Sequence, residues 1–179
     1  MFILKFDYKN PSDIPLLKEY YSLVDENDFP EDYPGDMFSN ICRYHYIAID
    51  FSNSKILGRL LFKPSIIENK LNYHIYNIST INWNNKYKDS YKNIGTSLIK
   101  EMVNDIKNIH NINSFLHNNL NIDIKNSFKY SHFNFINDNS SQSIIIFLFP
   151  DYKTKKFYKK LGFIKTSFVS TMYYSILIN

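Results

Sequence analysis

Six residues, Lys92–Ser97, join a strand-like segment to the most regular helical pattern of the sequence. The first main-chain N–H groups of a helix have no partner inside the helix, and the helix dipole places positive charge beside them. Glycine lets the backbone come close to a ligand, and asparagine tolerates the left-handed conformation. The turn is therefore a candidate phosphate site, made of Lys92, Asn93, Ile94, Gly95, Thr96 and Ser97.

A second segment with chemical potential is Phe157–Phe163, which reads Phe-Tyr-Lys-Lys-Leu-Gly-Phe. The phenol of Tyr158 has a reference pKa of about 10, so it is protonated at neutral pH and can act as a general acid. A purely structural hydroxyl is the alternative interpretation of Tyr158. Phe157 and Phe163 are expected to pack in the core.

Apolar runs and alternation predict the strands that position these two segments. The strands are expected over Phe2–Asp7, Tyr44–Phe51, Lys55–Phe62, Leu71–Trp83 and Ser143–Phe149, with one or two more in Phe163–Ile178. Helical spacing predicts helices after the start signal Asn10–Asp13, over Gly95–Ile109 and over Thr154–Leu161, with a short turn at Met37–Ile41. Gly162 is a natural cap for the third of these helices. The order of the elements indicates an α/β fold.

Composition predicts one domain over residues 1–179, because 179 residues with 44% apolar content match a globular chain of that size. The single cysteine, Cys42, excludes an internal disulfide, and no metal site is expected. The net charge of +4 rests on 19 lysines and only two arginines, which fits an anionic small ligand at least as well as nucleic acid. The apolar runs are too short to span a membrane and the first residues do not form a signal peptide, so a soluble, cytoplasmic protein is expected.

One segment, from about residue 108 to 141, does not fit a compact domain. Residues 108–139 alone include 10 asparagines. Connections longer than about 12–15 residues are usually functional or disordered. A low-complexity insertion is the simpler interpretation, and a substrate lid or an oligomer contact is the alternative.

Together the two motifs resemble those of the GNAT superfamily of acetyl-CoA-dependent N-acetyltransferases. The turn at Asn93–Ser97 is similar to the end of the family's diphosphate loop, and Phe157–Phe163 is similar to the family's Phe-Tyr…Gly-Phe ending. The arginine or glutamine at the family's loop entry corresponds to Lys88 if two residues are inserted, which is the preferred alignment, or to Ser90 without a gap. The resemblance implies a GNAT acyl-CoA acyltransferase fold, which has a mixed, mostly antiparallel central sheet flanked by helices. It also implies acetyl-CoA as cosubstrate, held by the turn, by Lys88 and by Asp151, which replaces the family's asparagine.

The same resemblance implies roles on the strand before the turn and on Tyr158. Main-chain N–H groups of Ile81, Asn82 and Trp83 would hold the acetyl carbonyl, and Tyr158 would protonate the leaving thiolate. Many members of the family carry a carboxylate on this strand that deprotonates the amine. This chain has Ser79 and Thr80 at the aligned positions.

A catalytic base must therefore come from elsewhere, because residues 69–88 contain no aspartate or glutamate. The candidates are His74, Glu68, a carboxylate of the acidic loop Asp25–Asp36, or a chain of water molecules. A position on the surface of a strand is the simpler interpretation of His74. The other four histidines, for which solvent exposure is expected, are His45, His110, His117 and His132.

Within the superfamily, the glucosamine-6-phosphate N-acetyltransferases are the most similar group, on the segment Gly58–Glu68 and the Phe-Tyr ending. The resemblance implies acetyl transfer to a primary amine, with an amino-sugar phosphate such as glucosamine 6-phosphate as the best specific acceptor. A protein acetyltransferase, acting on N-termini or on lysines as in histones, and a catalytically degenerate acyl-CoA-binding protein are the alternatives. Coenzyme A and a small-molecule amine are the expected partners; nucleic acid and membranes are not, and a homodimer is one option for the assembly.

Overall fold

A computed structural model describes residues 1–24, 29, 42–67, 70–81, 87, 90–113, 143–167 and 170–177. Its strands are β1 (Phe2–Asp7), β2 (Tyr44–Asp50), β3 (Lys55–Ile67), β4 (Lys70–Thr80), β5 (Ser143–Leu148), β6 (Ile164–Lys165) and β7 (Met172–Leu177). Its helices are α1 (Asp13–Ser22), the short 3-10 helix η3 (Phe51–Asn53), α2 (Ile94–Asn113) and α3 (Lys155–Lys160). The turn predicted at Met37–Ile41 and most of the Asn-rich segment lie outside the described residues.

Hydrogen bonds link the strands in the order β1-β2-β3-β4-β5-β7-β6. Among the pairs whose register is described, β4–β5 is parallel and the other four are antiparallel. The predicted fold class, an α/β fold with a mixed, mostly antiparallel sheet, is confirmed. The chain divides into two compact units, Met1–Lys63 with Tyr76–Glu101 (unit 1) and Pro64–Ile75 with Met102–Asn179 (unit 2).

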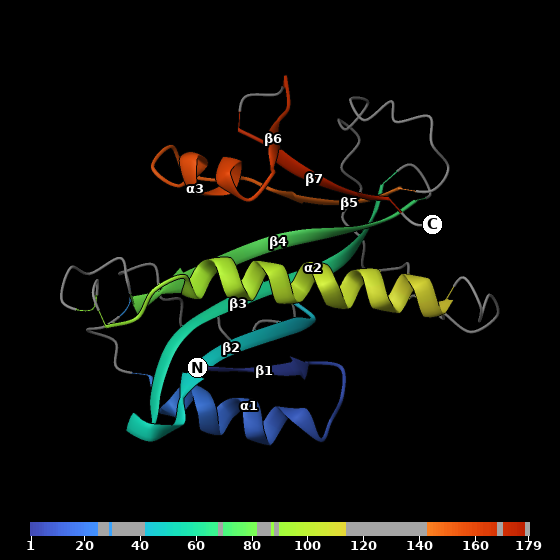
Figure 1. Ribbon diagram of the computed structural model, residues 1–179. Helices are drawn as coiled ribbons and strands as arrows, with labels where there is room; N and C mark the ends of the chain where they lie inside the picture. Colours follow the sequence, from blue (N-terminus) through green and yellow to red (C-terminus); the bar gives the residue numbers. More distant parts are fainter. Residues whose placement is uncertain are drawn as a thin grey trace. The chain divides into compact units, whose positions relative to one another are not determined.

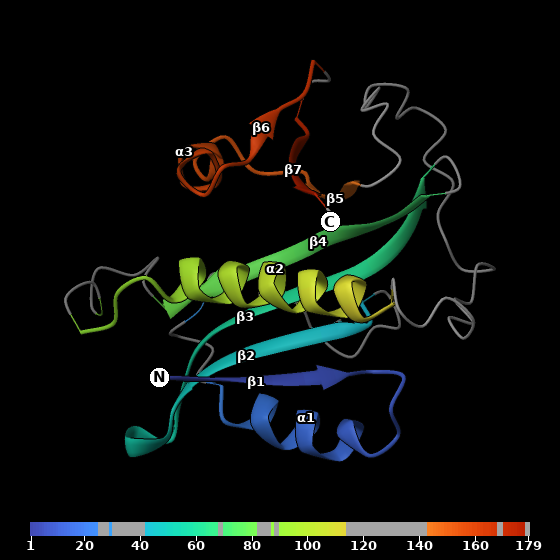
Figure 2. The same cartoon turned by 45° about the vertical axis from the view of Figure 1, so that its right-hand side comes forward.

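Unit 1 contains the antiparallel strands β1, β2 and the first part of β3, with α1 beside β1 (Figures 1 and 2). Five successive residues of β2, from His45 to Ile49, are buried, so this strand contributes side chains to the core on both of its faces. Helix α1 begins at Asp13, as the start signal predicts, and Asp13 accepts a hydrogen bond of 2.8 Å from the main-chain N–H of Asp7. Leu17 and Tyr21 form its buried face.

Strands β3 and β4 differ from their predicted bounds. β3 continues to Ile67 instead of ending at Phe62, although Lys63 and Pro64 interrupt the apolar pattern. Proline can lie in a strand where its missing N–H is not needed for pairing, so this residue does not end β3. β4 ends at Thr80, and the last two residues of its predicted range, Asn82 and Trp83, lie outside the described residues.

Helix α2 confirms the apolar stripe seen in the sequence. The buried side chains of the stripe are Ile94, Leu98, Ile99, Met102, Val103 and Ile106. Ile109, which the pattern also includes, is 42% exposed. The helix runs to Asn113 rather than Ile109, so its last turn enters the segment that composition assigns to the insertion.

Unit 2 is organised around β5, in which Ile144 to Leu148 are buried as predicted, whereas Phe149, the last residue of the predicted strand, lies beyond β5 and is exposed. β5 pairs in parallel with β4 at Tyr73 and His74, and antiparallel with β7 over its whole length. Ile145 and Phe147 of β5 form a core cluster with Ile67. The short helix α3 follows β5 and brings the Phe-Tyr motif into this unit.

Candidate functional site

The turn before α2 has the backbone geometry of an anion-binding site. Asn93 lies in the left-handed region, with φ of 60°, which is the conformation that its residue type was expected to tolerate. Its carbonyl accepts the first helical hydrogen bond, from the N–H of Ser97 at 2.9 Å. Within the described part of the chain, no group accepts a hydrogen bond from the main-chain N–H groups of Ile94, Gly95 and Thr96. The first turn of α2 contains no acidic residue that would compete with an anion.

Gly58 on β3 brings the end of β4 and the start of α2 together. A Cβ atom at this position would lie 2.8 Å from the main-chain oxygen of Ser79, 2.9 Å from Cγ2 of Ile94 and 3.1 Å from Cγ2 of Thr80. Only glycine allows such an approach. In the sequence, only the family resemblance draws attention to Gly58, which it places at the start of a strand. In the structure β3 begins at Lys55, so Gly58 lies inside the strand.

A hydrogen-bonded cluster joins the β2–β3 hairpin to the segment that leads into α2. The Tyr91 hydroxyl donates to Oδ2 of Asp50 at 2.8 Å and lies 3.3 Å from Nδ2 of Asn53, which also donates to Asp50 at 2.7 Å. Lys55 Nζ donates to the Tyr87 hydroxyl at 2.8 Å. The hydrogen bonds from Asn53 and Tyr91 lower the pKa of Asp50, so its carboxylate stays ionised. No local sequence pattern predicts this cluster, because Asp50 and Tyr91 lie 41 residues apart.

The strand before the turn is described only in part. Ser79 and Thr80 end β4, and the Ser79 hydroxyl donates to Oδ1 of Asn77 at 2.9 Å. Ile81 follows the strand and is fully buried. Three more residues of this region were predicted to bind the cofactor, and they lie outside the described residues: Asn82, Trp83 and Lys88. The role of their main-chain and side-chain groups stays a prediction.

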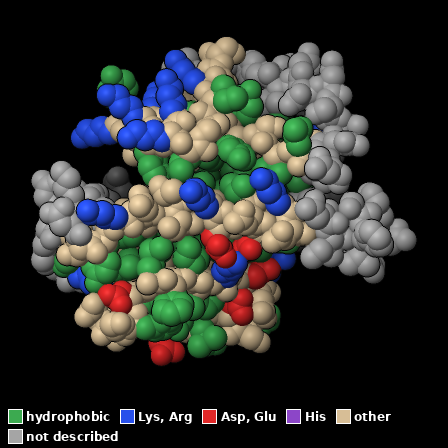
Figure 3. All heavy atoms as spheres, in the orientation of Figure 1, with side chains coloured by type: hydrophobic (Ala, Val, Ile, Leu, Met, Phe, Trp, Pro, Cys, Tyr) green, Lys and Arg blue, Asp and Glu red, His purple; other side chains and the backbone are tan. Residues whose placement is uncertain are grey.

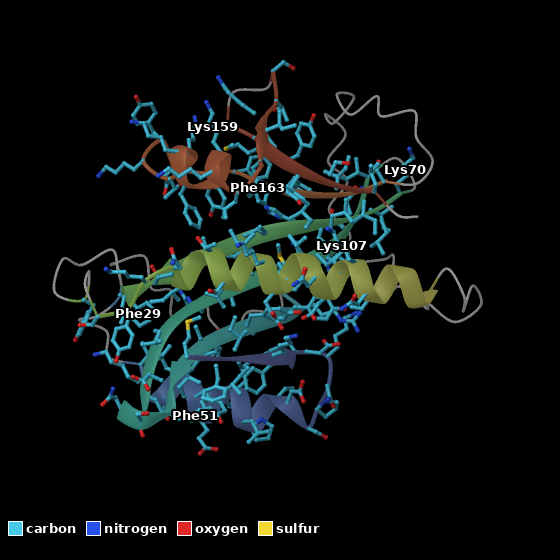
Figure 4. The ribbon with its side chains drawn as sticks, viewed as in Figure 1. Phe29, Phe51, Lys70, Lys107, Lys159 and Phe163 are labelled. Carbon is cyan, nitrogen blue, oxygen red and sulfur yellow. The ribbon has the colours of Figure 1, made fainter. Side chains whose placement is uncertain are left out.

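Tyr158 in unit 2 is fixed by the way in which α3 ends. The N–H of Gly162 donates to the carbonyl of Lys159 and the N–H of Phe163 donates to that of Tyr158, both at 3.1 Å. With φ of 91° at Gly162, this is a Schellman motif, and the predicted cap is confirmed. The rings of Tyr158 and Phe163 lie 5.6 Å apart between centroids, which is the apolar contact that such motifs contain; Figure 4 labels Lys159 and Phe163 beside α3.

The Tyr158 side chain is buried, and this sets its chemistry. Burial raises the pKa of its phenol, and the charge of Asp151 raises it further. The phenol is therefore protonated throughout the neutral range, as a proton donor must be. Within the described residues no hydrogen bond holds the Tyr158 hydroxyl. Phe163 is buried as predicted, whereas Phe157 is only half-buried.

The start of α3 and its surroundings are strongly basic. The Asp151 carbonyl accepts hydrogen bonds from the N–H and the hydroxyl of Thr154, both at 3.1 Å, while the residue itself is exposed. Residues 151–167 contain six lysines and this one aspartate, although the whole chain has a net charge of only +4. Lysine side chains gather over α3 in Figure 3. An anionic ligand would be attracted to this part of unit 2.

Two histidines differ from their expected exposure. His74, the base candidate, is 7% exposed and stacks on Phe147, with ring centroids 4.7 Å apart and an interplanar angle of 2°. The interpretation of His74 as a surface residue is wrong. His45 is also fully buried, and both of its ring nitrogens have partners: Nδ1 accepts from the Tyr21 hydroxyl at 2.9 Å and Nε2–H donates to the Cys42 carbonyl at 3.3 Å.

The structure brings some of the predicted residues together. In unit 1 the turn Lys92–Ser97 adjoins the end of β4 through the contacts at Gly58. Tyr158 and Asp151 belong to unit 2. The described ranges contain no group of three or more His, Cys, Asp or Glu side chains with metal-binding geometry. None of the helices in those ranges has the length and apolar content that crossing a membrane requires.

No protein-family model and no curated protein matches the chain. Among solved structures, a bacterial toxin aligns with a TM-score of 0.53 and 12% sequence identity, over 98% of this chain and 91% of the toxin chain. A likeness at that level of identity shows that the two chains share a fold. It does not extend to activity.

Two further structures are less similar. A GNAT family acetyltransferase from Brucella melitensis in complex with acetyl-CoA gives a TM-score of 0.47 at 12% identity, over 98% of this chain and 88% of that one. A mutant of the AtaT toxin, bound to acetyl-CoA and the C-terminus of the antitoxin AtaR, gives 0.44 at 14% identity, over 74% of this chain. The chain spans 66% of the AtaT chain, just under two thirds. Both scores are too low to support a conclusion.

Proposed function

We propose that the protein is an acetyl-CoA-dependent N-acetyltransferase of the GNAT type. The observation that carries the proposal is the turn before α2, with left-handed Asn93 and three main-chain N–H groups that no described residue occupies. The Phe-Tyr…Gly-Phe motif supports it, because its helix ends in the Schellman motif that holds Tyr158. The mixed, mostly antiparallel sheet is consistent with it.

A nucleotide diphosphate fits the turn in charge and in hydrogen bonding. The main-chain N–H groups of Ile94, Gly95 and Thr96 supply donors, and the positive end of the α2 dipole adds to the attraction. Lys92 is exposed beside them and adds a cationic group that can reach a phosphate. These residues, together with Asn93 and Ser97, would hold the diphosphate of acetyl-CoA.

Acetyl-CoA, when bound, supplies an acetyl thioester and leaves as a thiol. In the transfer, the amine nitrogen forms a bond to the acetyl carbon, the carbon–sulfur bond breaks, the amine loses a proton to a base and the sulfur gains one. Tyr158 would supply the proton to the sulfur, and main-chain N–H groups of Ile81–Trp83 would hold the carbonyl oxygen. His74, Glu68, a carboxylate of the Asp25–Asp36 loop and a chain of water molecules remain the candidates for the base.

The proposed acceptor is a primary amine, and an amino-sugar phosphate such as glucosamine 6-phosphate is the first to test. The lysine-rich segment 151–167 supports an anionic substrate, because it carries more positive charge than the chain as a whole. A homodimer and a cytoplasmic location stay predictions.

A thiol-release assay with acetyl-CoA tests the activity on a panel of amino sugars, polyamines and peptides. Release with glucosamine 6-phosphate alone would identify the small-molecule class, and release with peptides would identify a protein acetyltransferase instead. Binding of acetyl-CoA without release on any amine would indicate a degenerate acyl-CoA-binding protein. Acetyl-CoA at about 100 times its dissociation constant should stabilise the fold by about 2.7 kcal/mol, and no stabilisation would rule out the cosubstrate.

Tyr158→Phe tests the proton donor. We expect turnover to fall by about 10²-fold or more, because a general acid is lost, while the acetyl-CoA dissociation constant stays nearly unchanged. Tyr152→Phe is the matched control, since its side chain is 88% exposed and removal of its hydroxyl should change neither quantity. Equal turnover of Tyr158→Phe and the wild type would assign Tyr158 to packing.

A further inference from the structure

The segment before α2 is fixed at two points in unit 1. After the turn, Ile94 packs against Gly58 of β3. Before it, Tyr91 is bound to the hairpin that connects β2 and β3. Only Lys92 and Asn93 lie between these two points, so the path of the turn is set by where Tyr91 and Ile94 are held.

The β2–β3 hairpin, to which Tyr91 is bound, is itself held by several hydrogen bonds. Asp50 accepts from the main-chain N–H of Ser52 through Oδ1, and from Asn53 and Tyr91 through Oδ2. The Tyr91 hydroxyl thus joins a closed triangle with Asp50 and Asn53. Ser54, with φ of 48°, completes the tight hairpin before β3 starts at Lys55.

A second contact joins the same hairpin to Tyr87, four residues before Tyr91. Lys55 Nζ donates to the Tyr87 hydroxyl and also lies 4.2 Å from the centroid of its ring. The carbonyl of Tyr87 accepts from the N–H groups of Ser90 and Tyr91, each at 3.2 Å. A main-chain hydrogen bond therefore links the two tyrosines, and residues of the same hairpin hold both of their hydroxyls.

We infer that Tyr91, held by Asp50 and Asn53, is a positioning residue that presents the N–H groups of the Lys92–Ser97 turn to a diphosphate. The inference rests on the proposed function. A turn that is already held in its binding conformation loses less freedom when the ligand binds, so the ligand binds more tightly. Tyr91 does not touch the diphosphate in this account, and it acts through the backbone that follows it.

The direction in which Asp50→Ala changes the affinity for acetyl-CoA distinguishes a positioning role of Asp50 from a purely electrostatic one. The Asp50 carboxylate is the negative charge of this cluster, and a diphosphate is repelled by it. If Asp50 acted on the ligand only through its charge, Asp50→Ala would tighten the binding of acetyl-CoA. If it acts by holding Tyr91, Asp50→Ala weakens that binding, as Tyr91→Phe does without any change of charge.

The experiment measures dissociation constants for acetyl-CoA and for S-acetylpantetheine, which carries the thioester but lacks the diphosphate. We expect Tyr91→Phe to weaken acetyl-CoA binding about three- to tenfold, the effect of one hydrogen bond, and to leave S-acetylpantetheine binding unchanged. Tyr20→Phe is the control, because Tyr20 lies in unit 1 and its hydroxyl makes no hydrogen bond within the described residues. This control should bind both ligands as the wild type does.

Three results would overturn the inference. Unchanged acetyl-CoA binding by Tyr91→Phe would show that the hydroxyl does not position the turn. An equal loss for both ligands would show a general loosening of the fold, and tighter binding by Asp50→Ala would show a purely Coulombic effect. Each of these leaves the wild-type affinity for acetyl-CoA intact, whereas a wild-type protein that does not bind acetyl-CoA would refute the proposed function as well.

Discussion

Gly58→Ala adds a single methyl group, and two opposing effects decide whether it raises or lowers the free energy of unfolding. Gly58 does not have a positive φ, so alanine can adopt its backbone conformation. The loss of flexibility in the unfolded chain would then stabilise the protein by about 0.4–1 kcal/mol. Against this, the new Cβ would lie 2.8 Å from the main-chain oxygen of Ser79 and 2.9 Å from Cγ2 of Ile94.

The steric effect is expected to dominate. The Ser79 oxygen belongs to the backbone of β4 and cannot rotate away, so strand or helix must shift by several tenths of an ångström to restore an ordinary contact. Overpacking of this kind costs about 1–3 kcal/mol. We therefore expect Gly58→Ala to lower the free energy of unfolding by about 1–2 kcal/mol, and Gly58→Val to lower it further.

Urea unfolding followed by far-ultraviolet circular dichroism measures this difference. The shift of Ile94 should also displace the first turn of α2, so acetyl-CoA binding by Gly58→Ala should weaken under native conditions. A variant that is as stable as the wild type, or more stable, would refute the close approach of β4 and α2 at Gly58. Loss of stability with unchanged acetyl-CoA affinity would separate that packing from the site.

Two further predictions concern buried titratable groups in unit 1. Burial lowers the pKa of His45 to about 4 from 6.5, so the unfolded chain binds more protons between these values and stability should fall by about 3 kcal/mol as the pH drops through this window. Urea unfolding at pH 7, 5.5 and 4 should show this slope in the wild type and a flatter one in His45→Gln; equal slopes would contradict the assignment. Burial also raises the pKa of the Cys42 thiol to about 12, so Ellman's reagent should label it only in denaturant, and rapid labelling of the native protein would show that Cys42 is accessible.

The parts of the structure that follow from local sequence were predicted well. The apolar stripe of α2, the apolar run of β5 and the glycine that ends α3 each have their signal within a few residues. The left-handed conformation of Asn93 belongs to the same class, because it depends on the residue type and on the helix that follows. In these segments the tertiary contacts favour the same local structure as the sequence does.

Contacts between distant residues could not be predicted in this way. The buried ring of His45 has a hydrogen-bond partner in the hydroxyl of Tyr21, which lies 24 residues earlier. The link between Asp50 and Tyr91 joins residues 41 positions apart, and neither residue is part of a recognisable motif. Gly58 is important because of what β4 and α2 place beside it, and a single sequence contains no trace of that approach.

Two-dimensional ¹H–¹⁵N nuclear magnetic resonance during titration with acetyl-CoA can follow the main-chain N–H groups of α2 and so tests directly whether the turn binds the diphosphate. We expect the signals of Ile94, Gly95 and Thr96 to move downfield and to saturate with the binding curve, because these groups would donate to the diphosphate. S-acetylpantetheine should leave the same signals in place. If acetyl-CoA reaches saturation while these three signals stay where they are, the diphosphate binds elsewhere and the turn before α2 is not its site.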